Sequence, residues 1–172
     1  DGSIVDITTV QLFTTSLYGE YGFTNRLTGL IYFPFFVRNT VNEIQYNQSG
    51  NSGPGDALQS IGDTDVGIKY GLIVNKPVVV SATLILGLPL GIPAGGASQI
   101  LQTGDGEFNQ MIKVDASYSF YPKPFYVSTY AAFNNRTNGF SDEIRFGAEV
   151  GFTLKKFIPI LKLNVVQSLY NG

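Results

Sequence analysis

The chain has 172 residues, of which only 14% are charged, and it contains 13 Phe and 10 Tyr. Soluble domains carry about 25% charged residues, so the chain has little charge with which to coat a water-facing surface. The formal net charge of −2 gives no basic face, and we therefore expect no nucleic-acid partner. Cys and His are both absent, which excludes disulfides, thiolate or imidazole metal sites and His-dependent catalysis.

The most informative stretch is residues 77–95, PVVVSATLILGLPLGIPAG, which has no charged residue. Apolar side chains occupy its even positions from Val78 to Ala94, and Ser, Thr, Gly and Pro fill most of the odd ones. This period of two predicts a β-strand rather than a helix. A strand needs about 9 to 11 residues to cross a bilayer, so the length favours a membrane strand.

Seven further segments have strand-forming residues, most of them with the same alternation, and are expected to be strands: 4–21, 27–38, 61–73, 108–120, 125–134, 143–154 and 157–169. Long polar loops are predicted at 39–61, 95–107 and 135–142, the first of them mobile. Short and longer connections thus alternate along the chain. The pattern predicts a single domain over 1–172, an all-β, up-and-down antiparallel transmembrane β-barrel with about eight strands.

Alternation alone leaves open which face looks inward. A soluble lipocalin-like barrel turns the apolar face around a ligand. The length of the strands, the low charge of the polar face and the aromatics near strand ends favour an apolar face that contacts membrane lipid.

The runs IGDTDVGIKYGL, LGLPLG, LQTGDGEF and DEIRFGAEVGF resemble the outer-membrane transporter-like barrels of the MetA pathway of phenol degradation, which are themselves likened to long-chain fatty-acid channels. The resemblance covers most of residues 15–165. It implies a Gram-negative outer-membrane barrel that passes small, often apolar, compounds. Members of this family are usually longer, so the chain is also interpreted as part of a larger barrel.

In this interpretation the polar face lines the lumen, and its charged residues are Asp63, Asp65, Lys69, Lys113, Asp115, Glu143, Arg145, Glu149 and Lys162. They either form a polar constriction or pair across strands and rigidify a plugged interior, and for eight strands we favour pairing. Pro89 and Pro93 cannot donate ladder hydrogen bonds. They either open the barrel wall laterally for an apolar solute or simply end the strand.

Three functions follow. The first is a passive outer-membrane channel for small molecules, hydrophobic ones included. The second is a plugged accessory barrel that contacts other outer-membrane proteins, and the third is a soluble lipocalin-like binding protein. We expect no enzyme, no catalytic residue, no metal and no cofactor, although a hydrolase based on carboxylates is left open.

Overall fold

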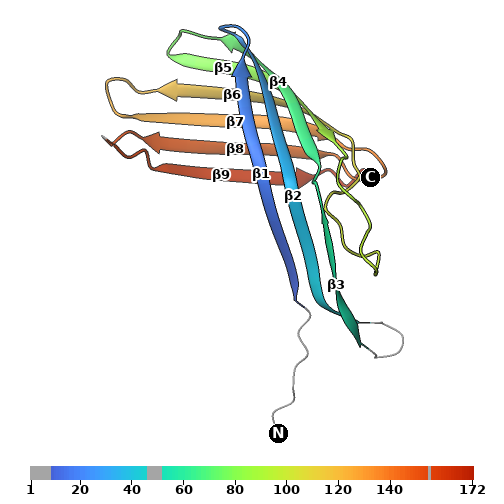
Figure 1. The fold of residues 1–172 in the computed structure, drawn as a ribbon. Coiled ribbons are helices and arrows are strands. Elements are labelled where there is room, and N and C mark those ends of the chain that lie inside the picture. Colours follow the sequence, from blue (N-terminus) through green and yellow to red (C-terminus); the bar gives the residue numbers. More distant parts are fainter. Residues whose placement is uncertain (1–8, 46–51, 155) are drawn as a thin grey trace. The chain divides into compact units, whose positions relative to one another are not determined.

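The computed structural model describes residues 9–45, 52–154 and 156–172, and its regular elements are all strands. Figure 1 labels them β1 to β9 in chain order. Their bounds are β1 Val10–Gly22, β2 Leu27–Gln45, β3 Ser52–Ser60, β4 Thr64–Ile73, β5 Val78–Leu88, β6 Asn109–Ser119, β7 Phe125–Asn135, β8 Glu143–Phe152 and β9 Ile160–Ser168.

Apart from β3, strands that follow one another in the chain also pair in the sheet. The order is β1-β2-β4-β5-β6-β7-β8-β9, and β3 pairs with β2 beside this path. The described pairings are antiparallel. The predicted all-β, up-and-down antiparallel class is therefore confirmed, and all eight expected strands are present.

The loop prediction for 39–61 is wrong over most of its described residues. β2 continues to Gln45, and β3 pairs with it from Val37↔Ser60 to Gln45↔Ser52. Among the described residues β3 pairs with β2 alone, so Pro54 can sit in this strand, opposite Glu43, without interrupting a ladder on a second side.

Two other predicted boundaries change. The strand expected over 77–95 covers only Val78–Leu88 and ends directly before Pro89, because a residue without a backbone N–H cannot donate to the ladder. The first strand begins at Val10 in the described residues, and the predicted positions 4–8 lie outside them.

The chain divides into two compact units. Unit 1 holds the N-terminal residues through Tyr18, Tyr32–Thr64 and Pro89–Gly106. Unit 2 holds Gly19–Ile31, Asp65–Leu88 and Glu107–Gly172.

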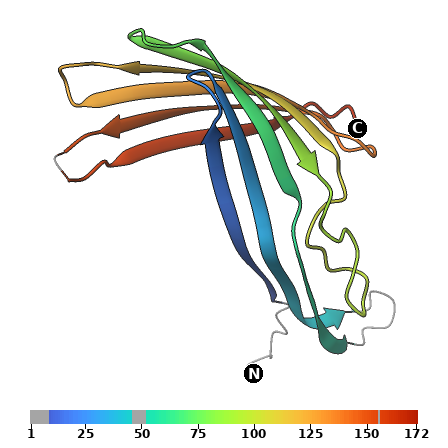
Figure 2. The same ribbon diagram turned by 45° about the horizontal axis from the view of Figure 1, so that its top comes forward.

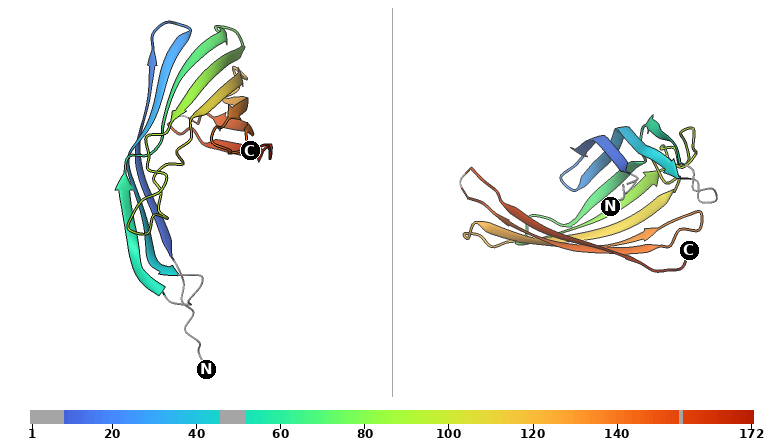
Figure 3. Two further views of the ribbon diagram at one scale, coloured as in Figure 1. Left: turned by 90° about the vertical axis from the view of Figure 1, so that its right-hand side faces the viewer. Right: turned by 90° about the horizontal axis from the view of Figure 1, so that it is seen from below.

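Strands β5 to β9 of unit 2 lie side by side in both Figure 2 and Figure 3. Their registers align one apolar row after another across five strands, for example Ala82, Val114, Ala131, Phe146 and Val165. We call this side of β5–β9 the apolar face. The opposite side, the polar face, carries the alternate residues.

The two faces differ in exposure. On the apolar face Val114 is 44% exposed and Phe146 46%, whereas on the polar face Thr83 is 3% and Asn134 2% exposed. On β5 to β8 the polar face is thus largely covered by side chains, while the apolar face is exposed. This is the reverse of a sheet that packs its apolar side into a core. On β9 both faces are exposed, as Val166 at 57% and Leu163 at 63% show.

Candidate functional site

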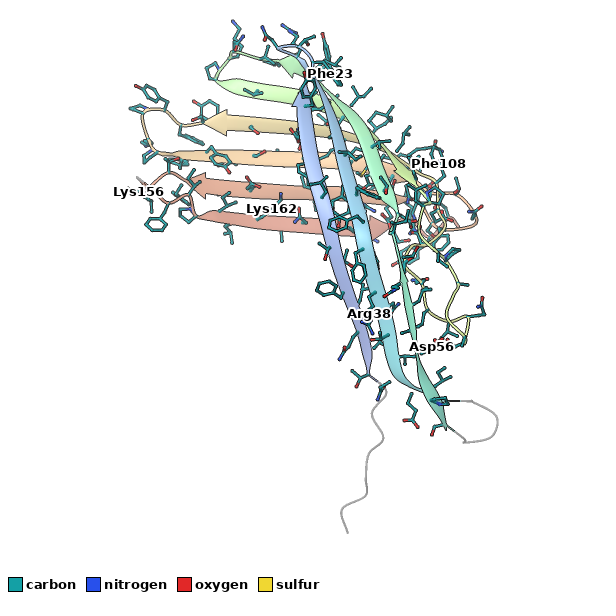
Figure 4. The ribbon with its side chains drawn as sticks, viewed as in Figure 1. Phe23, Arg38, Asp56, Phe108, Lys156 and Lys162 are labelled. Carbon is teal, nitrogen blue, oxygen red and sulfur yellow. The ribbon has the colours of Figure 1, made fainter. Side chains whose placement is uncertain are left out.

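The registers of β6–β9 place six of the nine predicted site residues together on the polar face of unit 2: Lys113, Asp115, Glu143, Arg145, Glu149 and Lys162. Glu149 lies directly opposite Lys162 on β9, and Asp115 lies opposite Tyr130 on β7. Figure 4 labels Lys162 on β9. The period-two pattern alone predicted this grouping.

Every one of these six side chains is ion-paired. Lys113 Nζ lies 2.7 Å from Asp115 Oδ1, and Lys162 Nζ lies 3.3 Å from Glu149 Oε2. Glu143 joins two cations, because its Oε2 accepts from Arg145 at 2.6 Å and its Oε1 from Arg136 at 3.3 Å. All six charges are thus paired, but only Glu149 and Lys162 pair across strands as predicted, whereas Lys113 with Asp115 and Glu143 with Arg145 pair along one strand.

Two tyrosines complete the polar face. Tyr130 lies opposite Gly147 and Tyr126 opposite Gly151, and a Cβ at either glycine would collide with the facing tyrosine ring. The glycines therefore make room for rings that lie flat on the sheet. The Tyr126 hydroxyl donates to Glu149 Oε1 at 2.7 Å and the Tyr130 hydroxyl to Asn164 Oδ1 at 3.0 Å.

A small polar hollow of about 70 Å³ lies among these groups, between Lys113, Tyr130, Glu149 and Lys162. It has room for ordered water between the charged heads. The Lys113 ammonium also lies 4.7 Å from the centroid of the Tyr130 ring, at which distance a cation is attracted by the face of the ring.

Asp65 and Lys69 also belong to unit 2 but lie on β4. Lys69 Nζ pairs with Glu20 Oε1 of β1 at 2.8 Å. Asp65 approaches Gly87, where an added Cβ would lie 3.2 Å from its Oδ1.

Asp63, the remaining predicted site residue, lies in unit 1 and holds the connection between β5 and β6. Its Oδ1 accepts the Gly91 amide at 2.9 Å, and its Oδ2 accepts the Asp105 amide at 2.7 Å. Burial raises the pKa of this carboxyl, and the neighbouring carboxylate of Asp105 acts in the same direction. Asp63 is thus a structural clamp within unit 1.

A second carboxylate holds the same connection. Asp56 of β3 accepts from the backbone N–H and the hydroxyl of Ser98, and these hydrogen bonds lower the pKa of Asp56 to about 2. Asn39 of β2 donates to the Gln102 carbonyl at 3.1 Å. The loop predicted over 95–107 is therefore pinned along unit 1, a role that the sequence pattern did not indicate.

Pro89 and Pro93 lie in this pinned connection, beyond the last paired residue of β5. Neither proline interrupts a paired strand. Their position fits the simpler of the two sequence interpretations, in which proline ends the strand.

Unit 2 also contains an apolar groove of about 580 Å³. Its lining residues come from β1, the β1–β2 turn, β2, β4 and β5: Gly19, Glu20, Tyr21, Phe23, Gly29, Leu30, Ile31, Val66, Gly67, Ile68, Leu84 and Leu86. Pockets of about 300 to 1,000 Å³ that are mainly apolar are typical of small-molecule sites. No part of the sequence analysis singled out this groove.

No protein-family model matches the chain, and no curated protein matches its sequence. No helix among the described residues is long and apolar enough to cross a membrane. Within the same residues, acidic side chains do not gather in a group of three or more that could hold a metal ion.

Proposed function

We propose that the strands of unit 2 form part of the wall of a β-barrel in the outer membrane of a Gram-negative cell. The apolar face contacts lipid, and the polar face lines a lumen through which small molecules pass, apolar ones included. The observation that carries the proposal is the bare apolar face, which continues across β5–β9. Only Thr129 and Gln167 interrupt its rows from Val78–Leu161 to Leu84–Gln167.

Strand length supports the proposal. The five strands have 11, 11, 11, 10 and 9 residues, within the range of about 9 to 11 that a tilted strand needs to span the hydrocarbon core. Backbone groups in lipid must all be hydrogen-bonded. The antiparallel ladders of β5–β9 meet this demand between neighbouring strands.

Aromatic side chains at the ends of the apolar face also support it. At the β6–β7 turn, Phe120 stacks on Phe125 with ring centroids 4.3 Å apart, and Phe125 lies 5.9 Å from Phe152. Phe133 lies near the opposite end of β7 and is 43% exposed. Aromatic belts at both interfaces are typical of outer-membrane barrels.

The plugged accessory barrel is the second candidate. The eight strands on the path of the sheet favour it, and the paired charges of the polar face fit it as well. A barrel of eight strands is filled by its own side chains, and the polar face holds no unpaired residue among the six charged ones on β6–β9. Such a barrel would act through its connections, with other outer-membrane proteins as partners.

The test is gel mobility in SDS with and without boiling, on protein extracted in mild detergent, followed by conductance in planar bilayers. A shift on boiling together with conductance supports the channel, and a shift without conductance supports the plugged barrel. Protein that stays soluble without detergent and shows no shift would refute both, in favour of a lipocalin-like binding protein.

A further inference from the structure

The apolar groove of unit 2 has the chemistry of a site for hydrocarbon. Its wall side chains are aliphatic or aromatic, chiefly Ile31, Val66, Ile68, Leu84 and Leu86, with Tyr21 and Phe23 at one end. Leu84 and Leu86 continue the even-numbered row of β5 that begins at Val78, so the groove adjoins the apolar face. Figure 4 labels Phe23 in the β1–β2 turn.

Glycines in the lining leave space in the groove because they have no side chain. Gly19 of β1 and Gly29 of β2 present no side chain to it. A Cβ at Gly19 would meet only Ile31 Cγ2 at 3.6 Å, which is an ordinary contact, whereas a Cβ at Gly29 would lie 2.8 Å from the Phe23 ring. The depression at Gly19 is therefore open space that a larger side chain can fill without a backbone clash.

Charge is kept away from the groove. Glu20 is the one residue of its lining that is charged at neutral pH, and its carboxylate forms an ion pair with Lys69 at 2.8 Å. Successive residues of a strand point to opposite faces, so Glu20 lies on the side opposite Gly19 and Tyr21. A groove without an exposed charge offers nothing to a polar head group and matches an apolar chain.

We propose that this groove binds one acyl chain of a membrane phospholipid and holds it longer than the rest of the apolar face does. The inference rests on the proposed function, because it requires the apolar face to lie in a bilayer. A chain seated between the side-chain walls makes contacts on several sides, and these dispersion contacts are individually small but additive. A flat part of the same face offers contacts on one side only.

The experiment uses quenching by phospholipids with brominated acyl chains, in vesicles of phosphatidylethanolamine and phosphatidylglycerol. The chain contains no Trp, so Tyr21→Trp reports on the groove and Phe146→Trp reports on the apolar face outside it. We expect both reporters to be quenched. Brominated and ordinary phospholipids would compete equally for an acyl-chain site, so retention is measured by adding detergent to vesicles in which all the phospholipid is brominated. The detergent-to-lipid ratio that removes half of the quenching should be several-fold higher for Tyr21→Trp than for Phe146→Trp.

Gly19→Leu fills the groove and should move the Tyr21→Trp curve onto that of Phe146→Trp. Gly22→Leu is the matched control, since Gly22 lies outside the groove and a Cβ there would meet nothing closer than Thr24 O at 4.0 Å. It should leave the difference between the reporters intact. If the Leu variant does not fold, Gly19→Ala replaces it; its single added methyl group should reduce the difference between the two reporters.

Two results would overturn the inference but leave the proposed function standing. The first is identical curves for both reporters without a substitution at Gly19. The second is a groove reporter that is shielded from brominated lipid while Phe146→Trp is quenched. The second would mean that another occupant fills the groove. If neither reporter is quenched, the apolar face is not in lipid and the proposed function itself fails.

Discussion

A charge placed at two depths of the apolar face separates a membrane sheet from a soluble one. Val114 and Val78 are the same residue type, and each is 44% exposed. Val114 is paired with Ala82 in the middle of the face, whereas Val78 is the first residue of β5 and pairs with Tyr118 at the end. The two Arg substitutions therefore differ from each other in the depth of the charge and in little else.

The two environments predict different costs. In a bilayer, Arg at the midplane of a barrel costs about 2 to 4 kcal/mol, and near the interface about 0 to 1 kcal/mol. The four steps from Val78 to Ala82 span about 13 Å of strand, which is enough to move from the interface toward the midplane. In water both substitutions are surface changes worth about ±0.5 kcal/mol.

The assay is reversible unfolding by urea of protein folded into phospholipid vesicles, with the free energy of unfolding measured for each variant. Val114→Arg should lose about 2 kcal/mol more than Val78→Arg, which is roughly a 30-fold difference in the unfolding equilibrium constant. Equal losses for the two variants would refute the assignment of this face to lipid.

Three further predictions concern the carboxylates. Glu149→Gln leaves Lys162 without its anionic partner and should shift the reversal potential in a KCl gradient toward anion preference; an unchanged potential would place this pair outside the conducting path. Asp63→Ala removes the acceptor of two backbone amides, so the connection between β5 and β6 should lose protection from hydrogen exchange, and undiminished protection would argue against the clamp. The pKa of Asp56 is lowered to about 2 by the hydrogen bonds from Ser98. The stability that the ionised carboxylate gives to the connection is therefore complete above the ordinary pKa of 3.8 and is lost as the pH falls through about 2. Proteolysis near Ser98 should increase over that pH range, and it should increase less in Asp56→Asn.

The sequence predicted the strands well wherever one face is uniformly apolar. β8 is the clearest case, because Ile144, Phe146 and Ala148 alternate with Glu143 and Arg145. Such alternation marks a sheet with two different environments, and it also fixes which side chains share a face. The six charged residues on β6–β9 could be grouped for this reason, without knowledge of the register.

The sequence analysis missed features that depend on the register of paired strands or on contacts between residues far apart in the chain. The segment SGPGDALQS of β3 contains Gly and Pro and has no apolar alternation. It is a strand because β2 extends far enough to pair with it, so tertiary pairing overrides local preference. The Asp63 clamp likewise depends on Gly91 and Asp105 returning to a carboxylate 28 and 42 residues away.

The tyrosine and glycine pairs lie between these two cases. Tyr126 with Gly151 and Tyr130 with Gly147 follow from one register of the β7–β8 hairpin. A ring that covers a facing glycine is a known stabilising arrangement in sheets. A search for Tyr on one strand opposite Gly on the next could have found both pairs, whereas periodicity within a single strand could not.

The origin of the ion pairs bears on the choice between the two candidate functions. Glu149 pairs with the directly opposite Lys162, Asp115 with Lys113 two residues away, and Glu143 with Arg145 two residues away. The partners thus come from the same or the neighbouring strand, and the pairs require no side chains from an opposite wall. A sheet whose charged side chains pair with one another in this way can line a water-filled lumen as readily as a lumen filled by side chains. It also presents little net charge, so a pore lined by it should pass cations and anions almost equally; a strongly selective wild-type conductance would show that groups outside this face set the permeation path.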